Sequence, residues 1–387
     1  MNENLRIVFG LSGGLALFLF GMNLMSESLK KAAGASIKTI MSVLAKNPLL
    51  GVFVGALSTA VLQSSSATTV MVIGFVSAGV MSLPVAIAII FGANIGTTIT
   101  AQIIAFKLSD YIYAFIFIGF AISFIVKNQK WKNFGTTIFA FGLLFLGIET
   151  MGGVMKPLAK SAIFIEMMRK VSDVPLLGVL TGTLMTLIVQ SSSATIAVLQ
   201  NFASQDAGDG MSSVIGLSGA IPILLGDNIG TTITAVLASI GQSKNAKRSA
   251  LAHSLFNISG ALIFIWIIPI FAKFVQAVSP KGIEVEVISR QIANAHTIFN
   301  LAMTLLWLPL LNVMVKIVTR LVKDDKPKEK LAITDVGRLL NYRLLNEPES
   351  AFLLIQSKVE KVLDFAKITK SKVAEKKLNK AVKKGVK

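Results

Sequence analysis

The sequence predicts an all-α protein that crosses a membrane several times. Three observations support this fold class. Of the 387 residues, 53% are hydrophobic and only 15% are charged. The apolar residues gather in long stretches, and large parts of the chain occur twice. Soluble domains have about 25% charged residues, whereas a helix needs about 20 predominantly apolar residues to span a bilayer. An ordinary soluble enzyme is therefore excluded.

Hydropathy predicts seven full spans, each near the length that a membrane requires. They cover residues 5–28, 83–105, 111–126, 133–155, 213–240, 250–272 and 291–315. Two further apolar stretches, 48–80 and 175–200, are interrupted by polar clusters, and we expect each to form a re-entrant helical hairpin. Backbone turns at membrane depth only where protein or a water-filled cavity satisfies its polar groups, so the interruptions point to a functional site.

An internal repeat organises the chain. Residues 48–68 align with 175–195 at an offset of 127 residues, with 14 identities in 21 positions. Residues 92–101 align with 226–235 at an offset of 134. Three predicted spans lie between the two hairpins, and an odd number places the hairpins on opposite sides of the membrane. The repeats are therefore predicted to be inverted, each with a span, a hairpin, a broken span and a further span.

The repeats divide the chain into four predicted parts. These are repeat 1 (1–130), repeat 2 (131–275), an additional C-terminal span (276–320) and a helical tail (321–387). The tail carries 17 Lys+Arg against 9 Asp+Glu, within a total net charge of +18. Such a basic flank favours the cytoplasmic side of a cell membrane, which puts the C-terminus inside and, with seven spans, the N-terminus outside. Anionic lipid explains the tail more simply than a nucleic-acid partner does.

Residue usage excludes several kinds of chemistry. The chain has no cysteine and two histidines, so disulfides and cysteine nucleophiles are excluded and a transition-metal site is not expected. Neither serine cluster has the pattern of a Ser-His-Asp elbow or a Ser-x-x-Lys pair that would activate a nucleophile. We therefore expect neither an enzyme nor an organic cofactor.

The hairpin tips have the chemistry of an ion site. Serine is a preferred N-cap, and a helix that begins there directs free N–H groups and its positive dipole end at the turn. Serine hydroxyls and glutamine amides are also neutral ligands for an alkali cation, so neither lysine nor arginine is required at the tips. The alternative is that these serines only pack helices together, which repetition of the whole cluster disfavours. The candidate anion-binding residues are Gln63, Ser64, Ser65, Ser66, Gln190, Ser191, Ser192 and Ser193.

The repeated Gly-Ala/Asp-Asn-Ile-Gly-Thr-Thr motif is the candidate for cation binding, because it invites a helix break with exposed carbonyls. Alternatively, Gly92 and Gly226 only permit close helix contact. Asp227 replaces Ala93 of the first repeat, and a carboxylate inside a membrane is a functional hypothesis by default. The candidate sodium-binding or coupling residues are Thr68, Asn94, Thr97, Thr98, Thr195, Asp227, Asn228, Thr231 and Thr232.

Three other polar residues lie in apolar stretches. His253 and His296 occur in similar hexapeptides, 43 residues apart. They could relay protons or bind substrate, but hydrogen bonds between packed helices are the favoured interpretation. Glu149 lies nearer the end of its predicted span, and a functional role and a solvated or hydrogen-bonded one are equally open.

With paired QSSSAT hairpins followed by GANIGTT and GDNIGTT, residues 10–315 resemble the type II sodium/phosphate cotransporter family. The resemblance implies Na⁺-driven uptake of inorganic phosphate by alternating access, with the Gln-Ser-Ser-Ser clusters contributing to the phosphate and sodium sites. The short segment between the hairpins indicates the compact bacterial kind.

The tail and the transported ion leave further questions open. Asn346-Glu347-Pro348 and the helical pattern after it resemble the start of a phosphate-uptake regulator domain, which suggests a cytoplasmic phosphate-regulatory protein as a partner. The alternatives on the same fold are another oxyanion, proton coupling through Asp227, or a phosphate-sensing scaffold. The oligomeric state stays open, with a homodimer among the options.

Overall fold

The computed structural model describes residues 3–43, 47–106, 108–159, 166, 170–171, 173–324 and 356. Within these residues the chain is helical, with a single isolated β-bridge between Asp206 and Ser213. The α-helices are α1 (Glu3–Val43), α2 (Pro48–Leu62), α3 (Ser65–Ser77), α4 (Leu83–Ile104), α5 (Ile112–Ile125), α6 (Gln129–Ala159), α8 (Pro175–Val189), α9 (Ser192–Ala203), α10 (Gly216–Thr231), α11 (Ile233–Ser239), α12 (Lys244–Phe264), α13 (Ile268–Val278), α14 (Glu284–Trp307) and α15 (Leu311–Leu321). Two 3-10 turns, η1 (Ser109–Tyr111) and η2 (Ile265–Ile267), precede α5 and α13.

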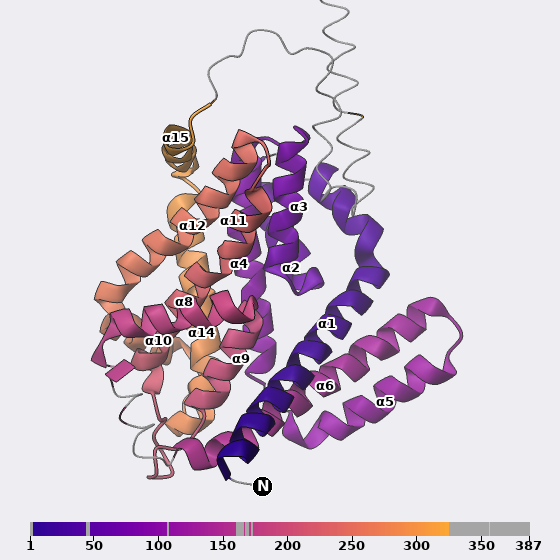
Figure 1. Ribbon diagram of the computed structural model, residues 1–387, viewed down its shortest axis with the longest axis vertical. Helices are drawn as coiled ribbons and strands as arrows, with labels where there is room; N and C mark the ends of the chain where they lie inside the picture. The colour runs from indigo at the N-terminus through magenta and orange to yellow at the C-terminus, as the bar shows by residue number, and fades with distance from the viewer. Residues whose placement is uncertain are drawn as a thin grey trace, which may run out of the picture.

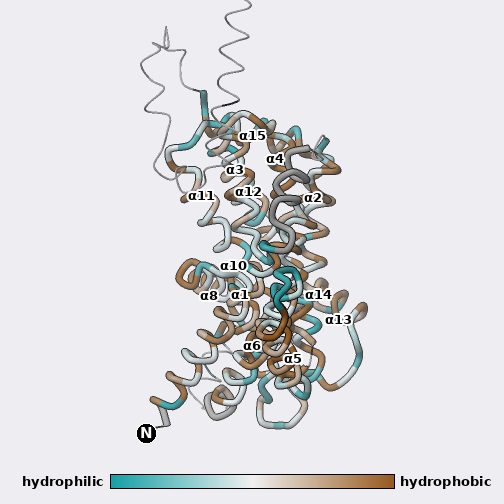
Figure 2. Tube along the Cα trace, turned by 90° about the vertical axis from the view of Figure 1, so that its right-hand side faces the viewer, coloured by the Kyte–Doolittle hydropathy of each residue, from teal (hydrophilic) through white to brown (hydrophobic). Residues whose placement is uncertain are grey.

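The predicted class of an all-α polytopic membrane protein is confirmed. Among the described residues, five helical stretches are long and apolar enough to cross a membrane, and a bent pair can make a sixth. The predicted span 111–126 corresponds to the shorter apolar helix Ser109–Ile125. It lies antiparallel to α6, and the pair projects from the remaining helices (Figure 1). Hydrophobic residues run along both of these helices (Figure 2).

The predicted span 291–315 is wrong in its bounds. Helix α14 ends at Trp307, and α15 continues at 83° to it. Pro309 lies in the break and cannot continue a helix. In α15 the buried Leu311, Met314 and Val318 recur at helical spacing, so this helix is amphipathic. The apolar face of α15 raises the mean hydropathy of its sequence, so the sequence predicted a single span from α14 into α15.

The predicted broken span of the first repeat is also wrong, because α4 runs unbroken through the Gly92–Thr98 motif. The side chains of this motif bond the helix's own carbonyls: Asn94 Nδ2 donates to Ile90 O at 3.0 Å and Thr97 Oγ1 to Ala93 O at 3.0 Å. In the second repeat the helix does break within the motif, at its last residue Thr232, where α10 ends at Thr231 and α11 begins at Ile233.

Both predicted hairpins form as helix, tight turn and helix. Helices α2 and α3 are joined at Gln63 and Ser64, and α8 and α9 at Gln190 and Ser191. From its tip, α3 runs into the upper part of the molecule, whereas α9 runs into the lower part (Figure 1). The inversion of the two repeats relative to a membrane stays a prediction.

The two repeat glycines lie where helix backbones touch. A Cβ atom on Gly92 would collide with the carbonyl oxygen of Val52 in α2, and one on Gly226 with that of Val179 in α8. These contacts support the interpretation that both glycines permit close helix packing. They hold each hairpin tightly against the span that follows it.

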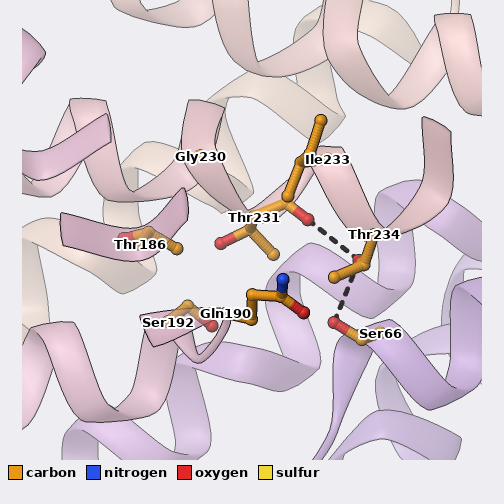
Figure 3. Close-up of a pocket in the computed structure, with 8 residues that line it drawn as sticks. All are labelled: Ser66, Thr186, Gln190, Ser192, Gly230, Thr231, Ile233 and Thr234. Carbon is orange, nitrogen blue, oxygen red and sulfur yellow. Dashed lines mark hydrogen bonds between the residues drawn. The ribbon is translucent and has the colours of Figure 1, made fainter. Parts of the chain in front are cut away.

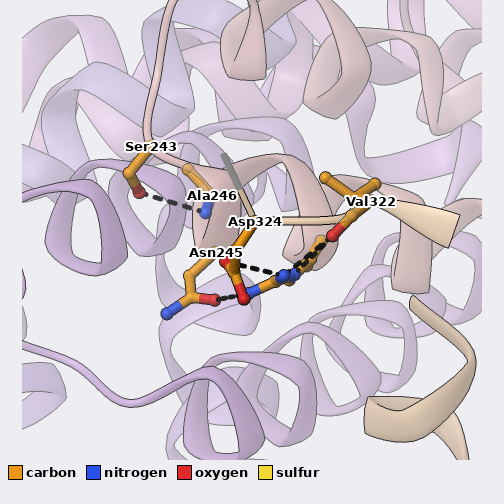
Figure 4. Close-up of polar contacts among 6 residues, drawn as sticks. Ser243, Asn245, Ala246, Val322 and Asp324 are labelled. Carbon is orange, nitrogen blue, oxygen red and sulfur yellow. Dashed lines mark hydrogen bonds and ion pairs between the residues drawn. The ribbon is translucent and has the colours of Figure 1, made fainter. Parts of the chain in front are cut away.

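The end of the described stretch 173–324 is tied to α12 (Figure 4). Arg248 is 5% exposed. Its Nη2 donates to Val322 O and to Asp324 Oδ1, both at 2.8 Å, and its Nη1 donates to Asn245 Oδ1 at 2.7 Å. Apart from 321–324 and 356, the predicted helical tail 321–387 lies outside the described residues.

Candidate functional site

The two hairpin tips line one cavity of about 350 Å³. Its wall combines both serine clusters with residues of α1 and with one face of α4. The lining residues are Leu19, Met22, Asn23, Ser26, Lys30, Gln63, Ser64, Ser65, Ser66, Thr97, Thr100, Val189, Gln190, Ser191, Ser192 and Ser193. The structure therefore brings together all eight residues that the sequence proposes for the anion, although they lie 127 positions apart.

Each tip presents a capped helix N-terminus. Ser64 Oγ accepts the N–H of Ala67 at 3.2 Å, and Ser191 Oγ accepts that of Ala194 at 3.3 Å. The N–H groups of the first two residues of α3 and α9 have no acceptor within their helices, because the first turn of a helix lacks preceding carbonyls. The partial positive charge there favours an anion.

Both tip glutamines hold a backbone conformation that side chains normally avoid. Gln63 has φ 51° and Gln190 has φ 54°, in the left-handed region. For a non-glycine residue this conformation costs on the order of 1–3 kcal/mol and tends to occur at functional sites. The strained turn allows each chain to reverse within two residues while the following serine caps a new helix.

A second, smaller cavity of about 10 Å³ lies beside the first (Figure 3). Its wall is formed by Ser66, Thr186, Gln190, Ser192, Gly230, Thr231, Ile233 and Thr234. Thr234 Oγ1 donates to Ser66 Oγ at 3.1 Å, so the first tip meets the second repeat here. The space approximates that of one water molecule, and the polar atoms facing it are neutral oxygens and an amide. This chemistry suits a small dehydrated cation.

Asp227 lies behind this small cavity. Its side chain is fully buried, and its Oδ1 accepts the hydroxyl of Thr186 at 2.6 Å. Thr186 Oγ1 is also 3.0 Å from Thr195 Oγ1, whereas Asp227 Oδ2 has no hydrogen-bond partner among the described residues. The carboxylate is therefore linked to the cavity by its hydrogen bond with Thr186 and does not line it.

Four other predicted sodium residues make contacts within or between helices. Asn94 Oδ1 is 3.3 Å from His253 Nε2, and Asn228 Oδ1 is 3.2 Å from His296 Nε2. The favoured interpretation of both histidines, hydrogen bonding between packed helices, is confirmed. Thr98 and Thr232 donate to carbonyls of their own helices, and none of these four predicted residues lines either cavity.

The four remaining candidates lie in four different places. Thr97 lines the large cavity and Thr231 the small one. Thr68 is bonded to Thr59 at 2.9 Å, the counterpart of the Thr186–Thr195 contact. Glu149 is exposed and lines neither cavity.

Sequence reasoning missed the contribution of α1. Asn23, Ser26 and Lys30 line the large cavity, and Ser26 Oγ donates to Leu62 O at 2.6 Å, just before the first tip. Their spacing of three and four residues puts them on one helix face, which was a usable signal. It also missed Thr100 and Thr234, which occupy matching positions of the two repeats.

Comparison with known proteins agrees with the anion-suited and cation-suited cavities described above. The profile of the Na⁺/Pi cotransporter family matches residues 17–153 and 155–307. The chain belongs to this family. It is therefore a multi-pass membrane transporter of the phosphate-transporting kind, and not an enzyme.

Three relatives show how far the similarity extends. YqeW of Bacillus subtilis (strain 168), an uncharacterised protein, is 33% identical over 274 residues, which cover 71% of this chain and 87% of YqeW. YjbB of Escherichia coli (strain K12), named as a candidate inorganic phosphate export protein, is 26% identical over 70% of this chain and 49% of its own length. Human sodium-dependent phosphate transport protein 2B is 40% identical over 101 residues, 24% of this chain and 14% of its own. No solved structure matches the chain.

Proposed function

We propose that this protein carries inorganic phosphate into the cell together with Na⁺, by alternating access. The observation that carries the proposal is the single cavity lined by both Gln-Ser-Ser-Ser tips. Two helix N-termini and a set of hydroxyls meet there, which suits an oxyanion. The small oxygen-lined cavity beside it suits a cation. Ser66, Gln190 and Ser192 line both cavities. The two ions would thus share ligands.

In this proposal the tip serines and Gln190 donate to phosphate, while Na⁺ occupies the small cavity. Ser66, Thr231 and Thr234 would supply its oxygen ligands, and Thr186 would be oriented by its bond to Asp227. A carboxylate placed behind the ligand shell stabilises a cation without repelling the phosphate directly. We infer that Thr97 contributes from the wall of the larger cavity, and that Thr68 and Thr195 support the tips from behind.

Two rival functions use the same cavities. Export is suggested by the name of the YjbB relatives, of which this chain spans about half. Proton coupling would use Asp227 in place of bound Na⁺. We propose import with the C-terminus in the cytoplasm and the N-terminus outside, since the basic tail favours that orientation.

Reconstituted protein in proteoliposomes tests these alternatives. Radioactive phosphate uptake is measured with an inward Na⁺ gradient, with K⁺ replacing Na⁺, and with a proton gradient alone. We expect accumulation only with Na⁺, and reversal of the net flux when the Na⁺ gradient is reversed. Equal uptake with K⁺ would overturn sodium coupling, and uptake driven by the proton gradient alone would favour proton coupling.

Direction in the cell needs a separate measurement. The protein is expressed in bacteria that lack their own phosphate importers, and growth and phosphate content are followed at low external phosphate. Import predicts rescue that requires external Na⁺, whereas export predicts loss of intracellular phosphate. Wild-type protein that binds phosphate but moves none under any gradient would support a sensing scaffold.

A further inference from the structure

One face of α1 forms the wall of the phosphate cavity that the tips do not supply. Asn23, Ser26 and Lys30 are all lining residues. The bond from Ser26 Oγ to Leu62 O at 2.6 Å ties this face to the last residue of α2 before Gln63. Lys30 follows Ser26 by one helical turn, so α1 holds it in register with the first tip.

Lys30 is the sole charged residue among the described residues that line this cavity. The other polar groups are neutral hydroxyls and amides. Inorganic phosphate carries a full negative charge or more, and moving an ion out of water is costly unless nearby groups compensate its charge. Helix N-termini each supply only about half an elementary charge. A lysine at the wall adds the full positive charge that the tips lack.

We propose that Lys30 is a phosphate-binding residue that sets the affinity of the cavity for its anion. The inference rests on the proposed phosphate transport. A lysine suits this role because its ammonium is a point charge on a flexible stem, so it can follow an anion that must later leave. A fixed bidentate arginine pair would hold the anion more rigidly. This proposal leaves the tips themselves without lysine or arginine, as the sequence predicts, and adds a charge from α1.

A simpler explanation is that Lys30 is one of two exposed lysines that meet lipid headgroups. Lys31 provides the matched control for this. Lys31 is the next residue and is also exposed, but it does not line the cavity. A membrane-surface role predicts that the two lysines behave alike, whereas a substrate role predicts that they differ.

The experiment compares Lys30→Gln, Lys30→Arg and Lys31→Gln with wild type in proteoliposomes at saturating Na⁺. We expect Lys30→Gln to raise the KM for phosphate about tenfold to a hundredfold, the range for losing a hydrogen bond to a charged group. Lys30→Arg should recover most of the affinity, and Lys31→Gln should match wild type. The Na⁺ concentration for half-maximal rate should change little in all three.

Phosphate binding to purified protein, measured by calorimetry with Na⁺ present, separates affinity from turnover. Lys30 is exposed, so each variant should keep the wild-type gel-filtration profile. A wild-type KM in Lys30→Gln would overturn this inference alone. Equal losses in Lys30→Gln and Lys31→Gln that vanish in vesicles of neutral lipid would also overturn it. Wild-type protein that neither binds nor moves phosphate would instead refute the proposed function.

Discussion

The two hairpin tips share the sequence Gln-Ser-Ser-Ser-Ala-Thr, yet their glutamines make different contacts. Gln63 is 9% exposed, and its Oε1 accepts the hydroxyl of Thr100 at 2.8 Å. Gln190 is exposed and lines both cavities. Thr234, which matches Thr100, donates to Ser66 of the other tip at 3.1 Å. The first tip is therefore held by both repeats, and the second tip is held by neither threonine.

This difference shows that two tips of the same sequence can make different contacts in one structure. In a transporter built from two repeats, each conformation is expected to treat the repeats unequally, and the opposite conformation exchanges their roles. Here the exchange would move Thr234 from Ser66 to Gln190 and Thr100 from Gln63 to Ser193. The observed contacts then represent one of two arrangements, and variants can show whether the second exists.

The largest effect is expected at the matching glycines, where the two repeats pack in the same way. Gly92→Ala and Gly226→Ala should each prevent correct folding, because a Cβ would collide with a carbonyl of the hairpin packed against it. Overpacking typically costs about 1–3 kcal/mol, and we expect these two sites to lie at or above the upper end because the collision is with backbone. The measurement is the yield of monodisperse protein and its thermal transition in detergent.

Gly74→Ala is the matched control, since a Cβ there meets nothing within 4 Å and alanine favours a helix over glycine. It should be as stable as wild type. If one of the two repeat glycines tolerates alanine, the hairpins are not packed equally.

A second prediction uses the chemical difference between the halves, Asp227 against Ala93. Asp227→Asn keeps an acceptor for Thr186 and removes the charge behind the small cavity. We expect the Na⁺ concentration for half-maximal uptake to rise at least about tenfold, as for a lost charge-assisted contact. The KM for phosphate at saturating Na⁺ should change far less. Activation curves for both ions measure this.

Ala93 shows that the fold does not need a carboxylate at this position. Asp227→Asn protein that keeps its thermal transition but loses phosphate affinity, with unchanged sodium dependence, would reverse the assignment. A changed number of charges moved per cycle, measured electrically, would support it.

The third prediction tests the exchange itself. Ser66→Ala removes a contact seen in this arrangement, whereas Ser193→Ala removes one expected only in the other. Each should shift the balance between the two arrangements by about 0.5–1.5 kcal/mol, roughly twofold to thirteenfold, in opposite directions. The chain has no cysteine, so one introduced in place of Asn23 can report cavity access through its labelling rate from either side. Shifts in the same direction would contradict the exchange.

Much of this site could be predicted from the sequence, because the repeat marks it. A single polar cluster in an apolar hairpin could serve packing alone. Because the cluster occurs twice, both tips and their serine caps could be identified. The chemical difference between Asp227 and Ala93 was also visible. These features are local, so a short stretch of sequence contains them.

What the sequence did not show depends on packing between distant segments. The spacing of Asn23, Ser26 and Lys30 puts them on one face of α1, but it does not show that this face lines the same cavity as the tips. That contact depends on packing, such as the bond between Ser26 and Leu62. The break predicted within α4 does not occur, although the matching helix of the second repeat breaks with the same side-chain bonds from Asn228 and Thr231 to carbonyls of their own helix. The unequal states of Gln63 and Gln190 could not be predicted at all, because their surrounding sequences are nearly identical.

The smallest effect is expected from the tail beyond Asp325, and its removal tests whether the difference between the two tips arises from the repeats themselves. The end of α3 is tied to the loop before α12 by Ser77 Oγ, which donates to Gln242 Oε1 at 2.8 Å, and α12 carries Arg248, which binds Val322 and Asp324. The tail thus begins near the far end of the first hairpin.

Truncation after Asp325 keeps this anchor, so uptake and labelling should equal those of wild type. Truncation after Leu321 removes it, and the buried Arg248 would lose acceptors worth about 1–3 kcal/mol, seen as a lower thermal transition. If truncation after Asp325 alone made the two tips equally accessible, the tail and not the repeats would be the source of their difference.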